Sequence, residues 1–373
     1  MPKILQVSTR HNVGGISKLI IELLGDTDFE QVYATGVCEK NEKEFSLELP
    51  PRTKGGYAFY RLRRLKRSIS LLDDFLALFS LIKIIRQEKP DIIHTHMSKA
   101  GLLGRVAALL SFSGVKTVHS YHGHVLDGYF NKFFAQVIIS IEGFLGKYTD
   151  AFVFDGFQTL IEIKNYGIKP RKNQQVILPG LIKQISNKNL IRASDQKLRI
   201  LVVARIERIK RIDLILEVAR SLVENHPSLN YEIKIVGDGE LRQNFEKQSL
   251  SESLPIKFIG WTDSVNEYYQ EADLLLSTSD SEGTPLTFME AASFGCPIVS
   301  TNVGSIADLI DDKKTGILCG NTAENLAAEI AGLWENQALL HEYSRNTATK
   351  ASNEFTADKF IQKHSELYKS LLA

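Results

Sequence analysis

The sequence lacks several features that mark particular classes of protein. Only three of its 373 residues are cysteines, and none of them has a second Cys or His at the spacing of metal ligands. This use of cysteine is typical of small core residues in a reducing cytosol. The formal net charge of +1 gives no support to binding of nucleic acid. No apolar run approaches the roughly 20 residues that a membrane-spanning helix needs.

Sequence motifs for two common nucleotide sites are absent as well. No strand is followed by G-x-G-x-x-G, and no Gly-Lys-Ser/Thr marks a P-loop. A nicotinamide dehydrogenase is therefore the least favoured enzyme class. Met1-Pro2-Lys3 runs directly into an apolar strand, which leaves no room for a signal peptide. We expect a cytoplasmic protein that contacts a membrane, if at all, at its inner face.

Strand-like and helix-like segments alternate along the whole chain, which predicts doubly wound parallel sheets of the α/β class. The length predicts two domains, and the polar stretch 186–197 is interpreted as the linker between them. In the first half, strands are expected near residues 3–7, 32–38, 91–95, 116–119, 151–154 and 175–178. In the second half, they are expected near residues 198–204, 231–236, 256–259, 274–277, 297–300 and 316–318.

The stretch 279–297 follows the apolar strand at 274–277 and leads into a helix. Glu282 falls in the loop between strand and helix, and Glu290 falls on the helix. Pro285 suits the first helical turn, so the backbone amides around it point out of the positive end of the helix. Those amides belong to Gly283, Thr284 and Leu286. The sequence therefore predicts an anion site here, with a carboxylate on each side of it.

The pair Glu282 and Glu290, with seven residues between them and Gly-Thr-Pro-Leu after the first, resembles the E-x7-E signature of retaining GT-B glycosyltransferases, in particular glycosyltransferase family 4. The alternative is a solvated helix edge, since two glutamates eight apart are common. The resemblance covers nearly the whole chain and implies two Rossmann-like domains that face each other across a cleft. It implies an acceptor-side domain over residues 1–185, a nucleotide-sugar domain over 186–354, and a helix over 355–373 that crosses back. Glu282 would hold the donor's sugar hydroxyls and Glu290 its ribose.

Arg205 and Lys210 follow the strand at 198–204. They resemble the family's phosphate-binding pair in G-R-L-x-x-x-K-G, but Ala204 and Arg211 replace both glycines, which puts the local backbone in doubt. Two fixed cations stabilise the charge that builds on a leaving diphosphate. The resemblance thus implies catalysis by Arg205, Lys210, Glu282 and a histidine, with no metal ion or cofactor. The alternative for Arg205 is a surface salt bridge with Glu207.

Three further residues complete the predicted donor site. Gly14 and Gly15 end the first strand and open a helix, where glycine lets the backbone approach a ligand. A tight turn is the alternative. In the family, a Gly-Gly loop here faces the donor. Trp261 lies in a segment that resembles the one whose backbone meets the nucleotide base.

Five histidines emerge from two adjacent strand ends in the first half: His94, His96, His119, His122 and His124. A zinc site is the weaker interpretation, because no two of them share a helix face at the i, i+4 spacing. The family places a histidine beside the donor sugar after this strand, and His122 matches best. His119 and His124 are the other candidates, and each of the three has a satisfied core histidine as its alternative. His96 and His124 are also predicted on the acceptor side.

Basic residues of the first half are candidates for contacts with phosphate. Lys99 and Arg105 are predicted on the acceptor side, with plain solvation as the alternative. A basic stretch precedes the apolar run 69–85, and it is interpreted either as a solvated helix face or as a contact with anionic lipid. Its members are Arg61, Arg63, Arg64, Lys66 and Arg67.

The resemblance implies a retaining, metal-independent transferase that moves a hexose or N-acetylhexosamine from a nucleotide sugar, with UDP the expected nucleotide. The acceptor would be lipid-linked or another glycan in the synthesis of a cell-surface polysaccharide. A nucleotide-sugar 2-epimerase of the same fold and a non-catalytic sugar-nucleotide-binding subunit are the alternatives.

Overall fold

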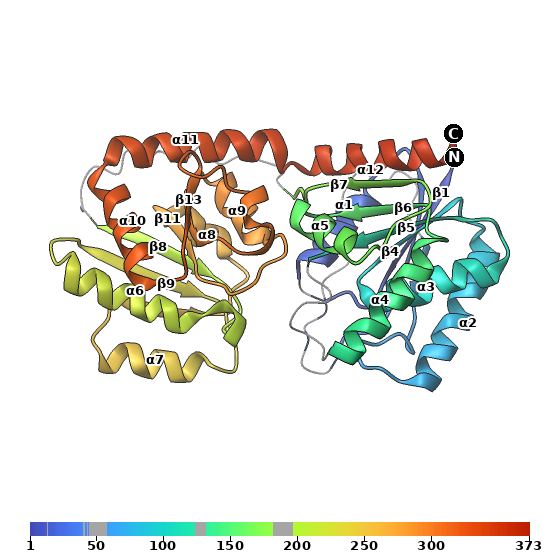
Figure 1. The fold of residues 1–373 in the computed structure, drawn as a ribbon, viewed down its shortest axis with the longest axis horizontal. Coiled ribbons are helices and arrows are strands. Elements are labelled where there is room, and N and C mark those ends of the chain that lie inside the picture. Colours follow the sequence, from blue (N-terminus) through green and yellow to red (C-terminus); the bar gives the residue numbers. More distant parts are fainter. Residues whose placement is uncertain (13, 40–41, 43, 45–57, 124–131, 182–196) are drawn as a thin grey trace. The chain divides into compact units, whose positions relative to one another are not determined.

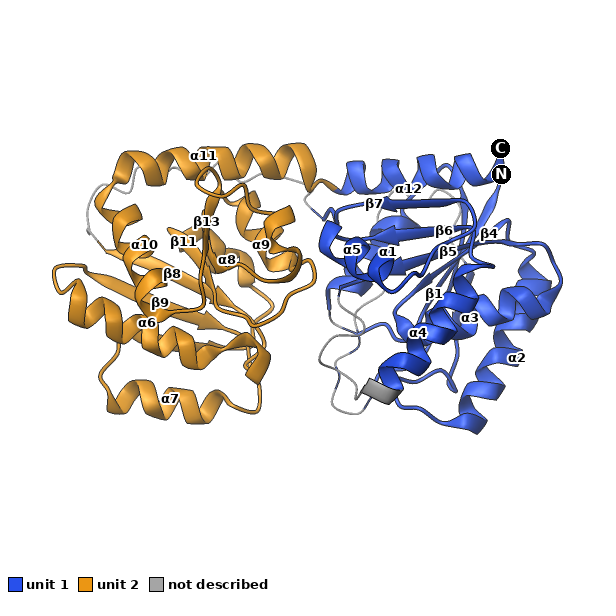
Figure 2. Ribbon diagram, viewed as in Figure 1, with its two compact units in different colours: residues 1–181, 357–373 blue, residues 182–356 orange. Residues whose placement is uncertain are grey.

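A computed structural model describes residues 1–12, 14–39, 42, 44, 58–123, 132–181 and 197–373 of the chain, without the side chains of residues 132 and 133. The chain divides into two compact units (Figure 2). Unit 1 comprises Met1–Leu181 and Ala357–Ala373, and unit 2 comprises Ile182–Thr356. The predicted linker falls mostly on residues 182–196, which lie outside the described part.

Unit 1 is built on a seven-stranded parallel sheet with the order β3-β2-β1-β4-β5-β6-β7. Its strands are β1 (Lys3–Ser8), β2 (Glu30–Thr35), β3 (Ala58–Arg61), β4 (Ile92–His96), β5 (Lys116–Tyr121), β6 (Ala151–Phe154) and β7 (Asn173–Val176). Its helices are α1 (Gly15–Leu24), α2 (Leu71–Glu88), α3 (Ser98–Ser111), α4 (Lys132–Gly146), α5 (Phe157–Asn165) and α12 (Ala357–Leu372).

The two faces of this sheet are covered by different helices (Figure 1). On one face, Leu5 and Ile93 pack against α2 and α3. On the other, Ile4 and Ile92 pack against α1 and α12. Because successive strand residues point to opposite faces, β1 and β4 are apolar on both sides, as buried parallel strands are. The last helix of the chain therefore completes the core of the first unit.

Unit 2 repeats this plan with a six-stranded parallel sheet of order β10-β9-β8-β11-β12-β13. Its strands are β8 (Leu198–Val203), β9 (Tyr231–Val236), β10 (Ile256–Gly260), β11 (Leu274–Ser277), β12 (Ile298–Thr301) and β13 (Gly316–Cys319). Its α-helices are α6 (Ile212–Asn225), α7 (Arg242–Ser251), α8 (Val265–Glu271), α9 (Leu286–Ser293), α10 (Ala323–Glu335) and α11 (Gln337–Glu354), and short 3-10 turns η1 (Arg208–Lys210) and η2 (Gly304–Asp308) follow β8 and β12.

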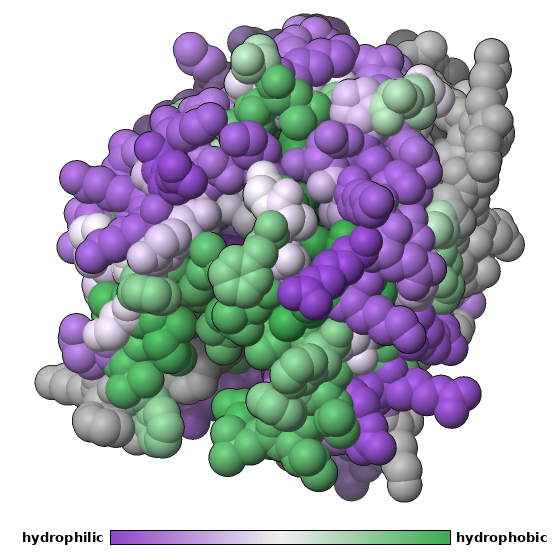
Figure 3. Space-filling model, turned by 90° about the vertical axis from the view of Figure 1, so that its right-hand side faces the viewer, coloured by the Kyte–Doolittle hydropathy of each residue, from purple (hydrophilic) through white to green (hydrophobic). Residues whose placement is uncertain are grey.

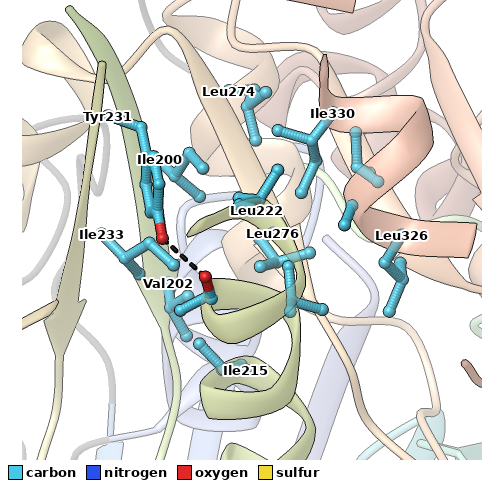
Figure 4. Close-up of a cluster of buried hydrophobic side chains, with 14 of the residues drawn as sticks. Ile200, Val202, Ile215, Leu222, Tyr231, Ile233, Leu274, Leu276, Leu326 and Ile330 are labelled. Atoms are coloured by element: carbon cyan, nitrogen blue, oxygen red, sulfur yellow. Dashed lines mark hydrogen bonds between the residues drawn. The ribbon is translucent and has the colours of Figure 1, made fainter. Parts of the chain in front are cut away.

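The core of unit 2 lies between its sheet and helices α6 and α10 (Figure 4). Side chains of β8, β9 and β11 meet Ile215 and Leu222 of α6 and Leu326 and Ile330 of α10. The Tyr231 hydroxyl donates to the Ala219 carbonyl in α6 at 2.7 Å, so this buried polar group is satisfied.

The predicted class, two Rossmann-like α/β domains, is confirmed, and all twelve predicted strands are present within a few residues. The sequence prediction missed β3, which is a four-residue edge strand with an alternating, half-exposed pattern. Such a strand has too few buried residues to stand out from its polar flanks. The strand expected at 32–38 lies at 30–35. The final helix, expected from residue 355, begins at Ala357, and two residues separate it from the end of α11 at Glu354.

Candidate functional site

Two loops leave neighbouring strands at the carboxyl edge of the unit 2 sheet. Residues 204–211 follow β8 and residues 278–285 follow β11, and these two strands pair with each other. The Thr278 hydroxyl lies 3.0 Å from the carbonyls of Lys210 and Arg211. The Asp280 amide donates to the Ile209 carbonyl at 2.9 Å. These bonds hold the loops side by side, at the place where open parallel sheets bind ligands.

The loops bring Lys210 and Glu282 into direct contact. The Lys210 ammonium lies 2.5 Å from Glu282 Oε1, and the Ser279 hydroxyl donates to the same oxygen at 2.6 Å. Both charged side chains keep part of their surface in solvent. An ion pair of this kind holds a cation at a fixed place and leaves it able to exchange partners with an incoming anion. We call Lys210, Ser279 and Glu282 the lysine–glutamate cluster.

Arg211 stands where the resembling motif has glycine, and its backbone is left-handed with φ 50° and ψ 50°. That conformation costs a residue with a side chain about 1 kcal/mol. Its guanidinium pairs with Asp213 at 2.9 Å and with Asp280 at 3.0 Å, which offsets part of the cost. The turn into α6 is therefore formed without the glycine.

Arg205 lies on the surface of unit 2. Its side chain is 74% exposed, and Nη1 lies 2.9 Å from Glu207 Oε1. This is the surface salt bridge that the sequence left as the alternative. Its predicted role as the second phosphate cation stays a prediction.

Glu290 projects from α9, whose first residue is Leu286, with Pro285 in the preceding cap position. Its Oε2 accepts a hydrogen bond from the Tyr269 hydroxyl at 3.1 Å. Burial raises the pKa of Tyr269 well above its ordinary value, and the neighbouring Glu290 carboxylate adds to the effect. Tyr269 is thus a donor that orients Glu290. The sequence analysis missed it, although it lies on α8, the helix directly before β11.

Other predicted donor residues of unit 2 occupy the same edge of its sheet. Gly283 and Thr284 are half-buried in the loop before α9, and Trp261, about half exposed, follows β10. Gly237 at the end of β9 has φ +136°, and a Cβ there would lie 1.9 Å from the Ala204 carbonyl oxygen. Glycine is required at that position by close packing of two strand ends.

In unit 1, Gly14 and Gly15 begin α1. The backbone of Gly14 is extended, with φ 179°, which any residue can adopt. Among the described residues, a Cβ at Gly14 would meet the Asn12 side chain at 3.6 Å, an ordinary contact. The described part of unit 1 therefore shows no packing reason for glycine at residue 14.

Four histidines of unit 1 gather around the ends of β4 and β5 and the face of α12. His94 bonds to the Tyr368 hydroxyl at 2.6 Å and to the Ser120 hydroxyl at 2.7 Å. His96 bonds to Gln6 and to His122, and His364 of α12 lies with its ring centroid 5.6 Å from that of His94. We call His94, His96, His122 and His364, with Gln6, Ser120 and Tyr368, the histidine cluster.

The Gln6 amide sets the direction of the hydrogen bonds in this cluster. Its Oε1 accepts from His96 Nε2 at 2.9 Å, so a neutral His96 has a bare Nδ1. That atom accepts from His122 Nε2 at 3.0 Å. His122 Nδ1 is then an acceptor, and it lies 4.0 Å from Asp155 Oδ2. His122 and Asp155 line a small cavity of about 10 Å³, close to what one water needs.

Burial keeps the rings of the histidine cluster neutral. Desolvation lowers the pKa of His122 and of His364 to about 4, and it lowers the pKa of His94 and His96 well below the ordinary value. An imidazole of this kind is a hydrogen-bonding group at neutral pH and carries no charge.

The other two candidate histidines differ from His122. His119 is buried, and its Nδ1 bonds to the Thr95 hydroxyl at 2.9 Å while its ring packs on Gly101. It is the satisfied core histidine that the sequence left as the alternative. His124 lies outside the described residues.

Arg105 is not available to an acceptor in this structure. It is 2% exposed, and its guanidinium contacts both oxygens of Glu142 in α4, at 2.6 and 2.8 Å. The Tyr121 hydroxyl donates to the same carboxylate at 2.7 Å. The expected acceptor contact of Arg105 is therefore corrected to a buried ion pair that joins α3 to α4. Lys99 pairs with Asp74 of α2 and keeps little exposed surface.

The described residues hold no group of three or more His, Cys, Asp or Glu arranged for a metal ion. The Asp26-Thr27-Asp28 segment lies ahead of β2, at the amino edge of the unit 1 sheet, where Lys369 pairs with Asp28 at 2.6 Å. A search of the helices in the described part finds none that is both long and apolar enough to span a bilayer.

The sequence analysis missed the partners that orient His122. Gln6 and Tyr368 take part in its hydrogen-bond chain, and Asp155 faces its free nitrogen. A signal was present in α12, because His364 and Tyr368 are four residues apart and so share one helix face.

Comparison with known proteins places both units in one family. The model for "Glycosyltransferase Family 4" matches residues 13–181, and the model for "Glycosyl transferases group 1" matches residues 183–350. The chain is 29% identical over 319 residues to an Escherichia coli UDP-Gal:alpha-D-GlcNAc-diphosphoundecaprenol alpha-1,3-galactosyltransferase, covering 81% of each protein. It is 28% identical over 307 residues to the O-antigen biosynthesis glycosyltransferase WbnH of Escherichia coli, covering 80% of this chain and 81% of that protein.

A solved structure shares the fold over the whole length. The Anabaena protein HepE, crystallised with UDP, matches with a TM-score of 0.76 at 16% identity, covering 99% of this chain and 100% of HepE. Two consecutive family models, each matched by one unit, and a full-length structural match lead to one conclusion. The chain belongs to the glycosyltransferases of family 4 and has their GT-B fold.

Proposed function

We propose that the protein is a retaining hexosyltransferase that moves a hexose or N-acetylhexosamine from a UDP-sugar to a lipid-linked or glycan acceptor during synthesis of a cell-surface polysaccharide. The observation that carries the proposal is the lysine–glutamate cluster at the carboxyl edge of the unit 2 sheet. The Escherichia coli galactosyltransferase relative is named for transfer from UDP-Gal to a GlcNAc-diphosphoundecaprenol acceptor, and this supports the choice of substrates. The reaction would take place at the cytoplasmic face of the membrane.

In this proposal, Lys210 leaves Glu282 in part to meet the donor diphosphate, with Arg205 as the second cation. A fixed ammonium stabilises the leaving phosphate more as its negative charge grows, so it lowers the barrier more than it strengthens ground-state binding. The amides at the start of α9 add partial positive charge. These groups neutralise the diphosphate without a metal ion.

The carboxylates and His122 orient the sugar nucleotide. Glu282 accepts hydrogen bonds from sugar hydroxyls, and Glu290, held by Tyr269, accepts them from the ribose. His122 offers a bare Nδ1 as a further acceptor. An acceptor hydroxyl attacks C1 from the side on which the phosphate leaves: the bond from C1 to the new oxygen forms, the bond to the phosphate oxygen breaks, and the phosphate takes the proton.

A thermal-shift screen against UDP, GDP and ADP tests the donor site. A nucleotide at about 100 times its dissociation constant adds roughly 2.7 kcal/mol to the free energy of unfolding. We expect UDP to stabilise the wild type in the presence of EDTA, and Lys210→Ala and Glu290→Ala to lose the response. Lys247→Ala, which removes an exposed lysine of α7 in the same unit, is the matched control and keeps the response. Equal responses from all variants would contradict the site.

Product analysis tests the reaction. Transfer from a UDP-sugar to a lipid-diphosphate sugar, followed by NMR of the new anomeric centre, gives retained configuration under the proposal. An inverted product would contradict the retaining assignment. A rearranged nucleotide sugar formed without acceptor would identify an epimerase, and tight UDP binding with no turnover would identify a non-catalytic subunit.

A further inference from the structure

Helix α2 is apolar on two opposite sides. Its inner side buries Ala77, Leu81 and Ile85 in the core of unit 1. Its outer side carries large apolar residues at the spacing i, i+3, i+4, i+7, and their side chains are between 38% and 68% exposed. These residues are Leu72, Phe75, Leu76 and Phe79, and Ile69 and Leu71, which are more exposed, precede them. A helix with apolar residues on two opposite sides normally has both of these sides covered.

Helix α4 shows the same pattern. Its outer side exposes Phe134, Val137, Ile141 and Phe144, again at helical spacing. Both α2 and α4 pack against α3, so the two exposed stripes belong to neighbouring helices of unit 1. Figure 3 views the molecule from the side on which α2 lies and shows apolar side chains gathered over the lower part of that face. We call these two stripes, with Ile69 and Leu71, the α2–α4 surface.

This concentration of apolar side chains is confined to unit 1. Twenty large apolar side chains are exposed among the described residues, and only Val223, Leu250 and Trp261 lie in unit 2. Single exposed apolar residues are normal on any protein, whereas a contiguous patch marks a binding surface. Unit 2 therefore serves as an internal reference for ordinary exposure in this chain.

The charges beside the surface are positive. Arg64 and Lys66 pair with Asp73 in the first turn of α2, at 2.7 and 3.2 Å, and this holds the basic stretch against the helix start. The second acidic residue of that turn, Asp74, is neutralised by Lys99. Arg63 and Arg67 are exposed and have no ion-pair or hydrogen-bond partner among the described residues. Exposed cations at the edge of an apolar patch are complementary to a layer of anionic headgroups.

We propose that the α2–α4 surface is the site at which this protein binds an anionic lipid bilayer. The apolar side chains enter the boundary between headgroups and acyl chains, while Arg63 and Arg67 contact the headgroup phosphates. The purpose of this contact rests on the proposed function, since an enzyme with a lipid-linked acceptor must meet it at a membrane. The binding itself does not require turnover.

Two partners could cover the α2–α4 surface, a bilayer or a second copy of the chain, and the charges beside the surface favour the bilayer. In a symmetric dimer the same patch meets itself, so Arg63 and Arg67 at its edge would face the apolar side chains of the α2–α4 surface of the second copy. Cations placed against an apolar surface lose hydration without gaining a counter-charge, which opposes association. A negatively charged lipid surface has no such conflict.

Cosedimentation with vesicles of phosphatidylcholine, with and without phosphatidylglycerol, tests the proposal. We expect the wild type to bind the anionic vesicles and to be released by salt. Phe75→Ser with Phe79→Ser lowers the partition coefficient at least about tenfold on both vesicle types, because apolar burial is lost. Arg63→Glu with Arg67→Glu lowers binding to the anionic vesicles alone. The controls in unit 2, Leu250→Ser and Lys247→Glu, bind like the wild type.

Far-UV circular dichroism and the UDP thermal shift are measured on every variant. Native spectra with an unchanged UDP response show that the substitutions act on lipid binding alone. Failure of the wild type to bind either vesicle, or equal losses in the unit 2 controls, would overturn the proposal. So would a dimer in size-exclusion chromatography that Phe75→Ser with Phe79→Ser dissociates. Vesicle binding without any nucleotide response would support lipid binding by the α2–α4 surface and refute the proposed function.

Discussion

The two sheets of this protein carry opposite kinds of polar group at their carboxyl edges. In unit 1, the edge holds buried, neutral imidazoles that are bonded to one another and to the last helix. In unit 2, it holds an ion pair between Lys210 and Glu282 that is only partly buried, with side chains 23% and 11% exposed. Seven of the nine histidines of the sequence belong to unit 1: His11, His94, His96, His119, His122, His124 and His364.

The two units thus use different interactions at these edges, a neutral hydrogen-bond network in unit 1 and a charged pair in unit 2. A neutral buried network fixes the orientation of a ring through many short hydrogen bonds, at the cost of desolvating each one. An ion pair that water still reaches keeps its charges and can exchange partners, because water weakens the attraction between them. Unit 1 is therefore built to orient His122, and unit 2 is built to present charge.

The largest expected effect is a loss of stability in unit 1 on acidification. The pKa of His11, His122 and His364 is lowered to about 4 in the fold, against an unfolded value of 6.5. Above pH 6.5 these histidines are neutral in both states, and the fold has its full stability. As pH falls from 6.5 toward 4, the unfolded chain binds protons that the buried rings do not, so the free energy of unfolding decreases. At pH 5 each such residue has lost about 2 kcal/mol.

Both tryptophans, Trp261 and Trp334, belong to unit 2, so fluorescence follows that unit alone while far-UV circular dichroism follows both. Urea unfolding at pH 7 and pH 5 should shift the dichroism transition and leave the fluorescence transition nearly in place. Equal shifts in the two signals would refute the comparison.

The next largest effect comes from breaking the buried ion pair of unit 1. Glu142→Gln leaves the Arg105 charge without a carboxylate inside the protein, and we expect a loss of about 3–5 kcal/mol in the free energy of unfolding. The matched change in unit 2 is Glu207→Gln, which breaks the exposed pair with Arg205 and should cost no more than about 1 kcal/mol. Similar losses from the two variants, measured by urea unfolding, would be inconsistent with this ranking.

Lys210→Ala should lower activity strongly and stability only slightly, unlike Glu142→Gln, which is expected to lower stability strongly. Under the proposed function, loss of the ammonium lowers kcat by about 10²–10³-fold, the usual effect of removing one group that stabilises transition-state charge. Stability should change by only about 1 kcal/mol, because the pair with Glu282 is partly solvated. Steady-state kinetics and urea unfolding of the same variant measure both quantities. A stability loss as large as that of Glu142→Gln would show a structural role instead.

The smallest effect expected is that of one hydroxyl in the histidine cluster. Tyr368→Phe removes the hydroxyl partner of His94 Nδ1 and of Gln6 Nε2 and should cost about 1–3 kcal/mol, seen by circular dichroism as unfolding of unit 1. Tyr231→Phe removes the bond to the Ala219 carbonyl in unit 2 and should shift the tryptophan signal instead. If Tyr368→Phe had no effect, the network would not contribute to the stability of unit 1.

The alternation of apolar strands and helices was enough to predict both sheets, because each buried strand has to be apolar on both faces. Glu282, Glu290 and Lys210 were predicted as site residues from short motifs that resemble those of the family, and their roles stay predictions. Their place at the carboxyl edge of the sheet follows from the strands that each motif adjoins. The short edge strand β3 could not be predicted, since its four residues are all at least partly exposed and carry almost no pattern.

The rest depended on contacts between residues far apart in the chain. Arg105 has the sequence context of a surface cation, yet α4 places Glu142 against it in the core. His122 owes its orientation to Gln6, near the start of the chain, and the network continues to Tyr368, near its end. The sequence by itself therefore determined the fold class and the charged groups of unit 2, which are local properties. Only the tertiary structure decided which histidine has an open acceptor nitrogen, which arginine is buried and which helix face stays uncovered, because burial and hydrogen-bond partners are set by segments that meet only in the folded chain.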